Sequence, residues 1–220
     1  MDRLALAHRL RLYVITDTRA ARGRSLVEIV AAALAGGATA IQLRDKSSST
    51  LAQVELGRAL RRLTAAAGAL LLVNDRVDVA HAIEADGVHL GPDDLPVAAA
   101  RAILGPRAIV GGSSGNLEEL ARSLADGVDY LGVGPMYPTV SKSDAGPAIG
   151  PGGLATIRQA TELPIVGIGG IDAANLGPVF EAGADGVAII SAIVGADEPA
   201  AATRRVRAAV DAALAERGRR

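Results

Sequence analysis

The chain has 220 residues and a formal net charge of −1; 50% of its residues are hydrophobic, but only 2% are aromatic. The near balance of acidic and basic residues argues against nucleic-acid or membrane partners. No cysteine is present, which excludes disulfides, thiolate catalysis and cysteine metal sites. The N-terminus lacks a signal-peptide apolar region, and no run of about 18 apolar residues occurs, so we expect a soluble, cytoplasmic protein.

Short apolar segments alternate with helical patterns along the chain. The segments expected to form strands are residues 12–17, 39–44, 69–76, 86–91, 107–110, 129–133, 164–168 and 186–190. The helical patterns cover residues 26–35, 50–67, 77–84, 95–104, 117–125, 154–160, 173–182 and 199–216. Ser25, Asn116 and Asp172 are expected to cap the helices that follow them. A long loop rich in Gly, Pro and Ser is expected over residues 134–153.

These eight strand–helix units predict one domain over residues 1–220, folded as a closed α/β TIM barrel, (β/α)₈. No boundary in composition is visible, and no strand is left over for a second sheet. The alternative is an open doubly wound sheet. The first strand–helix turn, Thr16 to Arg19, has no glycine cluster, which disfavours a dinucleotide-binding fold.

Polar residues stand where the predicted strands end, which is where the active site of such a barrel lies. Neighbouring strands are about 4.8 Å apart, so Asp75 and one of Asp93 and Asp94 are expected to face a single point. Two carboxylates without Cys or His beside them favour Mg²⁺, which completes its shell with water and substrate phosphates. The alternative is that Asn74 and Asp75 only start a turn or cap the next helix.

Two anion sites are expected at this mouth. Arg44 and Lys46 follow the second strand, where they could neutralise phosphates near the metal. On the opposite side, residues 167–171 and 190–193 are expected to bind a monophosphate through backbone N–H groups and a short extra helix. The loop over residues 134–153 would lie between them as a lid. An enzyme with two such sites is expected to join two phosphorylated molecules.

Five motifs, in order along nearly the whole chain, resemble those of the thiamine-phosphate synthase family. They are Gln42-Leu43-Arg44-Asp45-Lys46, Asn74-Asp75, residues 89–94, residues 134–142 and residues 167–171. The resemblance implies condensation of 4-amino-2-methyl-5-(diphosphooxymethyl)pyrimidine with 4-methyl-5-(2-phosphooxyethyl)thiazole, or its carboxylated form. The products would be thiamine phosphate and pyrophosphate.

The resemblance also implies roles for individual residues. The pyrimidine diphosphate would be held by Gln42, Leu43, Arg44, Asp45, Lys46, Asn74, Ser113 and Lys142. Mg²⁺ would be bound by Asp75 and Asp94. The thiazole phosphate would be held by Thr139, Val140, Ser141, Gly170, Ile190 and Ser191. The expected catalytic residues are Arg44, Lys46, Ser113 and Lys142. Three positions depart from the family pattern, which usually has Gln at Pro92, often Thr at Ser141, and a bulkier apolar residue at Gly112.

The expected mechanism is a dissociative substitution, in which cationic groups stabilise the departing pyrophosphate and the thiazole nitrogen then attacks. No general base is needed, and His89, inside the fourth strand, is expected to be structural. One alternative is the related thiazole tautomerase, which needs neither diphosphate nor metal. Another is a non-catalytic binder of phosphorylated metabolites. The sequence leaves the oligomeric state open, and a homo-oligomer is compatible with it.

Overall fold

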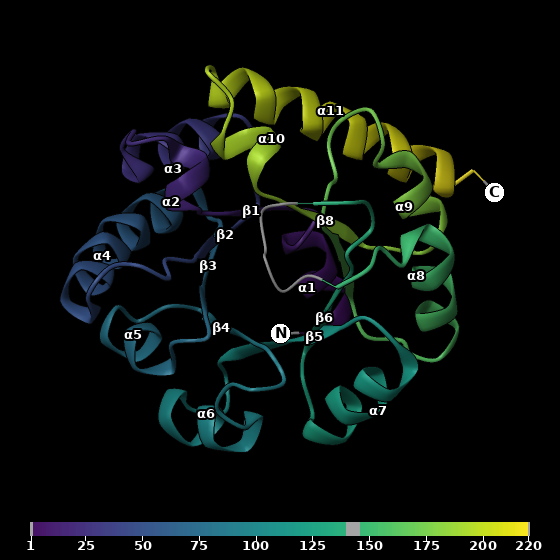
Figure 1. The fold of residues 1–220 in the computed structure, drawn as a ribbon, viewed down its shortest axis with the longest axis horizontal. Helices are drawn as coiled ribbons and strands as arrows, with labels where there is room; N and C mark the ends of the chain where they lie inside the picture. Colours follow the sequence, from purple (N-terminus) through teal and green to yellow (C-terminus); the bar gives the residue numbers. More distant parts are fainter. Residues whose placement is uncertain (1, 140–145, 220) are drawn as a thin grey trace.

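The structure, a computed structural model, describes residues 2–139 and 146–219. Eight parallel strands form a closed barrel in the order β1 to β8, which confirms the predicted TIM barrel and not the open sheet. Figure 1 looks down the barrel and shows the helices arranged around it. The strands are β1 (Leu12–Ile15), β2 (Ala40–Leu43), β3 (Leu70–Asn74), β4 (Gly87–Leu90), β5 (Ile109–Ser114), β6 (Tyr130–Val133), β7 (Ile165–Ile168) and β8 (Gly186–Ile189).

The described residues form eleven helices, including the eight whose patterns were predicted. These eight are α3 (Leu26–Ala35), α4 (Thr50–Ala67), α5 (Val77–Ala82), α6 (Val97–Leu104), α7 (Leu117–Asp126), α8 (Gly150–Gln159), α9 (Gly177–Glu181) and α11 (Pro199–Arg217). α10 (Ser191–Val194) is the short extra helix expected after the eighth strand. α1 (Arg3–Arg9) and α2 (Thr18–Ala21) were not predicted.

Two of the three predicted helix caps are confirmed. The side chains of Ser25 and Asn116 accept hydrogen bonds from the N–H groups three residues later, at the starts of α3 and α7. The cap at Asp172 is wrong, because its carboxylate closes a turn onto Ala174 and Asn175, and α9 begins only at Gly177.

Two predicted boundaries are also wrong. The fifth strand does not end at Val110, because the next four residues, to Ser114, continue the ladder with β6. The long loop was predicted to extend to Gly153, but α8 already begins at Gly150.

The barrel has two apolar cores. One lies between the strands and the surrounding helices, and the other lies inside the barrel. Leu6 of α1 and Leu10 just after it belong to the inner core, and both are buried. In Figure 1 α1 is seen behind the barrel centre, so this helix closes the end opposite the carboxyl ends of the strands.

One contact is repeated four times at this closed end. A polar side chain stands one residue before each even-numbered strand and accepts a hydrogen bond from a backbone N–H of the strand before it. The pairs are Thr39 with Leu12, Asp86 with Leu71, Asp129 with Val110 and Asp185 with Ile165, at 2.7–3.0 Å. Each aspartate also pairs with an arginine of the preceding even-numbered helix: Arg61, Arg101 and Arg158. These clamps tie neighbouring strands and helices together away from the mouth.

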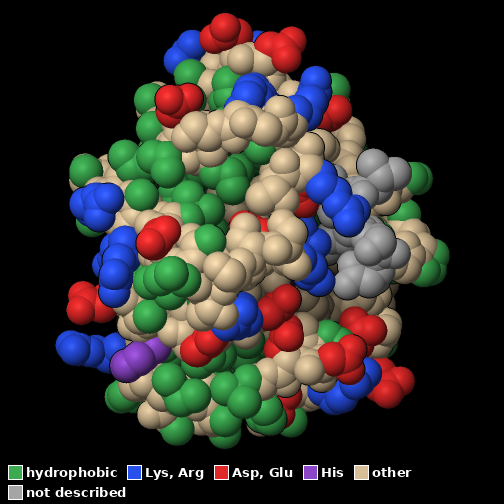
Figure 2. Space-filling view, turned by 60° about the vertical axis from the view of Figure 1, so that its left-hand side comes forward, with side chains coloured by type: hydrophobic (Ala, Val, Ile, Leu, Met, Phe, Trp, Pro, Cys, Tyr) green, Lys and Arg blue, Asp and Glu red, His purple; other side chains and the backbone are tan. Residues whose placement is uncertain are grey.

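None of the helices in the described part of the chain combines the length and apolar character needed to cross a bilayer. On the face drawn in Figure 2, basic and acidic side chains are interspersed among apolar ones.

Candidate active site

The ends of β1 and β2 are tied together at the mouth of the barrel. The backbone N–H of Arg44 donates to the hydroxyl of Thr16 at 2.8 Å, and that hydroxyl donates to the Arg44 carbonyl at 3.0 Å. The Arg44 guanidinium pairs with Asp17 at 2.8 Å, and each side chain is only 10% exposed. Asp17 uses its other carboxylate oxygen to cap α2. The mouth therefore contains a buried cation whose position is fixed by a buried carboxylate.

Arg44 has a buried donor nitrogen that these contacts leave unused. Its Nε is buried and has no hydrogen-bond partner among the described residues. A buried N–H without an acceptor is costly, so an acceptor delivered by a ligand would remove that cost.

The loop after Arg44 is organised by Asp45. Its carboxylate accepts hydrogen bonds from the backbone of Ser47 and Ser48 and from the Ser47 hydroxyl, at 2.9–3.1 Å. Burial alone would raise the pKa of Asp45, but its hydrogen bonds to these two serines lower it below the ordinary value. Gln53 of α4 donates to the carbonyls of Asp45 and Ser48. Asp45 thus shapes the loop that carries the exposed Lys46.

The acidic pair follows β3 and β4. Asp75 has a left-handed backbone (φ 64°), and its N–H donates to the carbonyl of His89 in β4. The N-cap of α5 is Arg76, with no side-chain capping bond, so the alternative that Asn74 or Asp75 caps this helix is wrong, whereas the alternative that they start a turn stays open.

Asp94 reaches the same edge of the barrel. Its carboxylate accepts a hydrogen bond from Gly91 N–H at 2.7 Å, directly after β4. Within the described ranges no group of three or more His, Asp or Glu side chains could hold a metal. Two carboxylates on neighbouring strand ends fit Mg²⁺, which needs only one or two from the protein.

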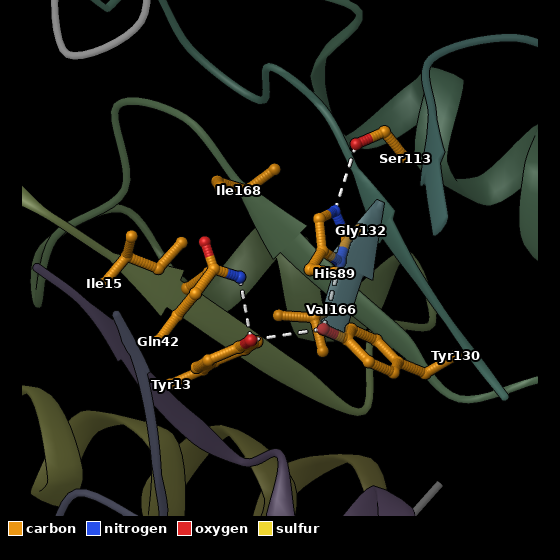
Figure 3. Close-up of a pocket in the computed structure, with 10 residues that line it drawn as sticks. Tyr13, Ile15, Gln42, His89, Ser113, Tyr130, Gly132, Val166 and Ile168 are labelled. Carbon is orange, nitrogen blue, oxygen red and sulfur yellow. Dashed lines mark hydrogen bonds between the residues drawn. The ribbon is translucent and has the colours of Figure 1, made fainter. Parts of the chain in front are cut away.

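A polar chain crosses the barrel interior below this edge. It runs from Gln42 through Tyr13, Tyr130 and His89 to Ser113 (Figure 3). These residues line a narrow cavity of about 20 Å³, whose other walls are largely apolar. Gln42 and Ser113 are therefore brought to one cavity, as expected of a shared substrate site.

The opposite side of the mouth is built by the loops after β6, β7 and β8. The N–H groups of Met136 and Tyr137 donate to the carbonyls of Ile168 and Gly169. Gly170 has φ 66°, and a Cβ there would lie 2.8 Å from the Pro138 carbonyl, so glycine is required for this close approach.

The loop after β1 holds α10 in place. Arg24 donates to the carbonyls of Val194 and Ala196 at the C-terminal end of this helix. Ile190 is buried at its start, and Ser191 is exposed in its first turn.

The remaining expected thiazole-phosphate residues lie in the loop after β6. Thr139 is the last described residue before the gap, and it is half-buried. Val140, Ser141 and Lys142 lie outside the described residues, so their predicted roles stay predictions.

Two of the departures from the family pattern lie away from the cavity. A Cβ at Gly112 would meet Val128 and Ser123 of the α7 side, so this position faces outward. Pro92 is exposed in the turn between Gly91 and Asp94.

Comparison with known proteins shows the family of this chain. The family model described as thiamine monophosphate synthase matches residues 12–193. The chain belongs to this family. The thiamine-phosphate synthase of Moorella thermoacetica is 54% identical over 199 residues, which are 90% of this chain and 95% of that protein. The thiamine-phosphate synthase of Chloroflexus aurantiacus is 51% identical over 209 residues, 94% of this chain and 96% of that protein.

Solved structures give the same result. Thiamine phosphate pyrophosphorylase from Pyrococcus furiosus superposes with a TM-score of 0.87 at 44% identity, covering 95% of this chain and 99% of that chain. A 3-hexulose-6-phosphate synthase, 22% identical with a TM-score of 0.65 over 91% of this chain and 99% of its own, shares the fold. Membership of the thiamine monophosphate synthase family therefore rests on both sequence and fold.

Sequence reasoning missed three residues of the candidate site. The sequence shows Asp17 only as the polar end of the first strand, and Tyr13 and Tyr130 only as strand residues. A signal was present, since the chain has only three tyrosines and one phenylalanine. Two of those tyrosines interrupt aliphatic strands that are otherwise built from small and branched residues.

Proposed function

We propose that this protein is a transferase that joins a pyrimidinylmethyl diphosphate to a thiazole phosphate, releasing pyrophosphate and forming thiamine phosphate. The observation that supports this most directly is that a buried cation and two carboxylates follow the carboxyl ends of three neighbouring strands, above a polar cavity. Arg44, Asp75 and Asp94 supply the charges, and the loop after β7 with α10 faces them.

The pyrimidine diphosphate would lie on the side of β2 to β5. Its ring would enter the cavity between Gln42 and Ser113, near Asn74 at the end of β3. Its diphosphate would meet Arg44, whose buried Nε offers an unused donor, and the exposed Lys46. Arg44 is held rigidly by Asp17, so its charge needs no reorientation during the reaction.

Asp75 and Asp94 would hold Mg²⁺, and the bound ion would supply positive charge to the diphosphate. In the reaction the bond between the methylene carbon and the diphosphate oxygen breaks, and its electron pair leaves with pyrophosphate. The thiazole nitrogen then forms the new C–N bond, and no proton has to move. Arg44 and Lys46, with Lys142 from the lid segment, would stabilise the departing charge.

The thiazole phosphate would lie on the opposite side. The N–H groups of Ser191 and Ala192 at the start of α10 have no partner within the helix and suit an anion, whereas those of Ile193 and Val194 donate to the Ile190 carbonyl. Gly170 and Thr139 stand on the neighbouring loops, with Val140 and Ser141 beyond Thr139 in the sequence. Two separate phosphate sites would hold the reacting atoms together and raise their effective concentration.

The proposal is tested by mixing purified protein with both phosphorylated substrates and Mg²⁺ and measuring pyrophosphate release. Asp75→Asn should lower the rate by about 100-fold, because it removes one charge from the electrostatic site. It should leave thermal unfolding almost unchanged, since Asn tolerates the same left-handed backbone. Asp93→Asn changes an exposed neighbour and serves as the matched control. Undiminished release in the presence of excess chelator would reject the metal role.

The alternatives predict different results. A thiazole tautomerase would act on the thiazole alone and would not depend on Arg44 or Asp75. A non-catalytic binder would bind both phosphates without releasing pyrophosphate. The buried Arg44–Asp17 pair at the mouth favours the diphosphate reaction, because a tautomerase has no use for a fixed cation at that position.

A further inference from the structure

Five side chains from five strands form one hydrogen-bonded chain inside the barrel. Gln42 Nε2 donates to the Tyr13 hydroxyl at 2.8 Å, and the hydroxyls of Tyr13 and Tyr130 lie 3.1 Å apart. His89 bridges the next step, with Nδ1 3.0 Å from the Tyr130 hydroxyl and Nε2 3.0 Å from Ser113 Oγ. Figure 3 shows the chain passing along one wall of the cavity, with Gln42 and Ser113 at its two ends.

Two glycines make room for this chain. A Cβ at Gly111 in β5 would lie 2.2 Å from the Tyr130 ring, and one at Gly132 in β6 would lie 2.9 Å from His89 Cε1. Both glycines are strand residues, where glycine weakens the strand because it restricts the backbone least. Their presence shows that the strands accommodate the Tyr130 and His89 rings in these positions.

The direction of the hydrogen bonds can be worked out from the number of hydrogens. Burial raises the pKa of both Tyr13 and Tyr130 above the ordinary value, so each phenol keeps its single hydrogen. Because Gln42 donates to Tyr13, the Tyr13 hydrogen is available for Tyr130, and the Tyr130 hydrogen for His89 Nδ1. With Nδ1 as an acceptor, a neutral imidazole carries its hydrogen on Nε2 and donates it to Ser113.

The opposite direction is less well satisfied. If Tyr130 donated to Tyr13, the Tyr13 oxygen would accept from both sides. Its own hydrogen would then have no acceptor among the described residues, although the side chain is buried. A buried donor without a partner costs about 1–3 kcal/mol. Only a reversed Gln42 amide would satisfy that direction, and it would place the His89 hydrogen on Nδ1.

We propose that Tyr13 and Tyr130 are positioning residues that hold His89 as its neutral Nε2–H tautomer. The Ser113 hydroxyl then accepts from His89 and keeps its own hydrogen for a ligand. At the other end, the Gln42 carbonyl oxygen points away from Tyr13 and is available as an acceptor (Figure 3). The cavity therefore offers one hydrogen-bond donor and one acceptor at fixed places.

This pattern selects the substrate ring, an inference that rests on the proposed function. A 4-aminopyrimidine offers a ring nitrogen that accepts from Ser113 and an amino group that donates to Gln42. In the corresponding 4-oxopyrimidine the ring nitrogen carries a hydrogen and donates, and the oxygen that replaces the amino group accepts. A site built to hydrogen-bond one pattern rejects the other, because its own polar groups would be left unpaired.

The first experiment measures the tautomer directly and needs no turnover. Protein labelled with ¹⁵N-histidine is analysed by long-range ¹H–¹⁵N correlation, and His89 is assigned with His89→Gln. The chain has only three histidines, and the other two, His8 and His81, are exposed. We expect an unprotonated Nδ1 and a protonated Nε2 in His89. A hydrogen on Nδ1 would overturn the proposal.

Two variants distinguish the effects of Tyr130 and Tyr13 on His89 in the same spectra. Tyr130→Phe should shift the His89 Nδ1 resonance downfield, because it removes the hydrogen-bond donor to that nitrogen. Tyr13→Phe should leave the tautomer in place, because Tyr130 can still donate. An unchanged Nδ1 resonance in Tyr130→Phe would also overturn the proposal.

The second experiment measures selectivity. The ratio of kcat/KM for the 4-amino and 4-oxo pyrimidine diphosphates is compared between the wild type and Tyr130→Phe. We expect this ratio to fall by about tenfold or more in Tyr130→Phe, since a lost hydrogen-bond match commonly changes discrimination by that much. Tyr137→Phe removes the same hydroxyl outside the chain, where it bonds to Asn175, and should keep the wild-type ratio.

The outcomes distinguish the two proposals. A wild type that releases no pyrophosphate from either substrate contradicts the proposed function, while the histidine spectra still decide the direction of the chain. A wild type that discriminates, with Tyr130→Phe discriminating equally well, contradicts the selective role of the chain alone.

Discussion

The Arg44–Asp17 pair gives the sharpest stability prediction. Asp17→Asn keeps the side-chain oxygen that caps α2 but removes the charge that neutralises Arg44. Breaking a buried ion pair by neutralising one partner costs about 3–5 kcal/mol. Both side chains retain 10% exposure, so we expect a loss at the lower end, about 3 kcal/mol. For a chain of this size that loss lowers Tm by about 6–12 °C.

The assay is urea unfolding followed by circular dichroism, which gives both the midpoint and the slope. Asp17→Ala should lose about 1 kcal/mol more than Asp17→Asn, because it also removes the cap of α2. The double variant Asp17→Asn with Arg44→Met gives the interaction energy between the two side chains. Its loss of unfolding free energy should be smaller than the sum of the losses in the single variants. A loss below about 1 kcal/mol in Asp17→Asn, or strict additivity in the double variant, would refute this reasoning.

Three further predictions concern the clamps and the barrel interior. Asp129→Ala should lower the free energy of unfolding by about 2 kcal/mol, because a backbone N–H and an arginine lose their acceptor; exposed Asp126, changed to Ala, should differ from the wild type by less than about 0.5 kcal/mol. Gly111→Ala should cost about 3 kcal/mol in the same urea assay, because its Cβ would overlap the Tyr130 ring, and an unchanged midpoint would contradict that geometry. The third concerns pH: burial raises the pKa values of Tyr13 and Tyr130, so above pH 10 the folded protein binds more protons than the unfolded chain. Stability should therefore be retained below about pH 10 and fall above it by up to about 2.7 kcal/mol per pH unit, with the slope halved in Tyr130→Phe.

The barrel itself could be predicted because its signal is local. Each strand is buried on both faces, so it appears as a short apolar run, and glycines mark several helix ends. α1 could not be predicted in the same way. Leu6 of this helix and Leu10 just after it pack inside the closed end of the barrel, and that inner core is assembled only when all eight strands meet.

The positions of several candidate site residues could be predicted from the same local signal, but their contacts could not. Gln42, Arg44 and Asp75 could be placed at the mouth because strand ends share one edge. What each side chain contacts could not be predicted, because the contacts join distant parts of the chain. Tyr13 and Tyr130 are 117 residues apart. Their pairing depends on how the inner faces of β1 and β6 meet across the barrel.

The two ends of the barrel differ in their contacts but share one backbone conformation. At the closed end, a polar side chain stands before every even-numbered strand and accepts a hydrogen bond from a backbone N–H of the preceding strand, and α1 adds apolar contacts. At the mouth, Asp75, Gly169 and Gly170 all have left-handed backbones. Glycine adopts this conformation without strain, and Asp and Asn are the non-glycine residues that adopt it most often. Glu84, before β4 at the closed end, also has a positive φ. The left-handed backbone is therefore shared by both ends of the barrel, and the rate of Asp75→Asn is the measurement that bears on the charge of Asp75.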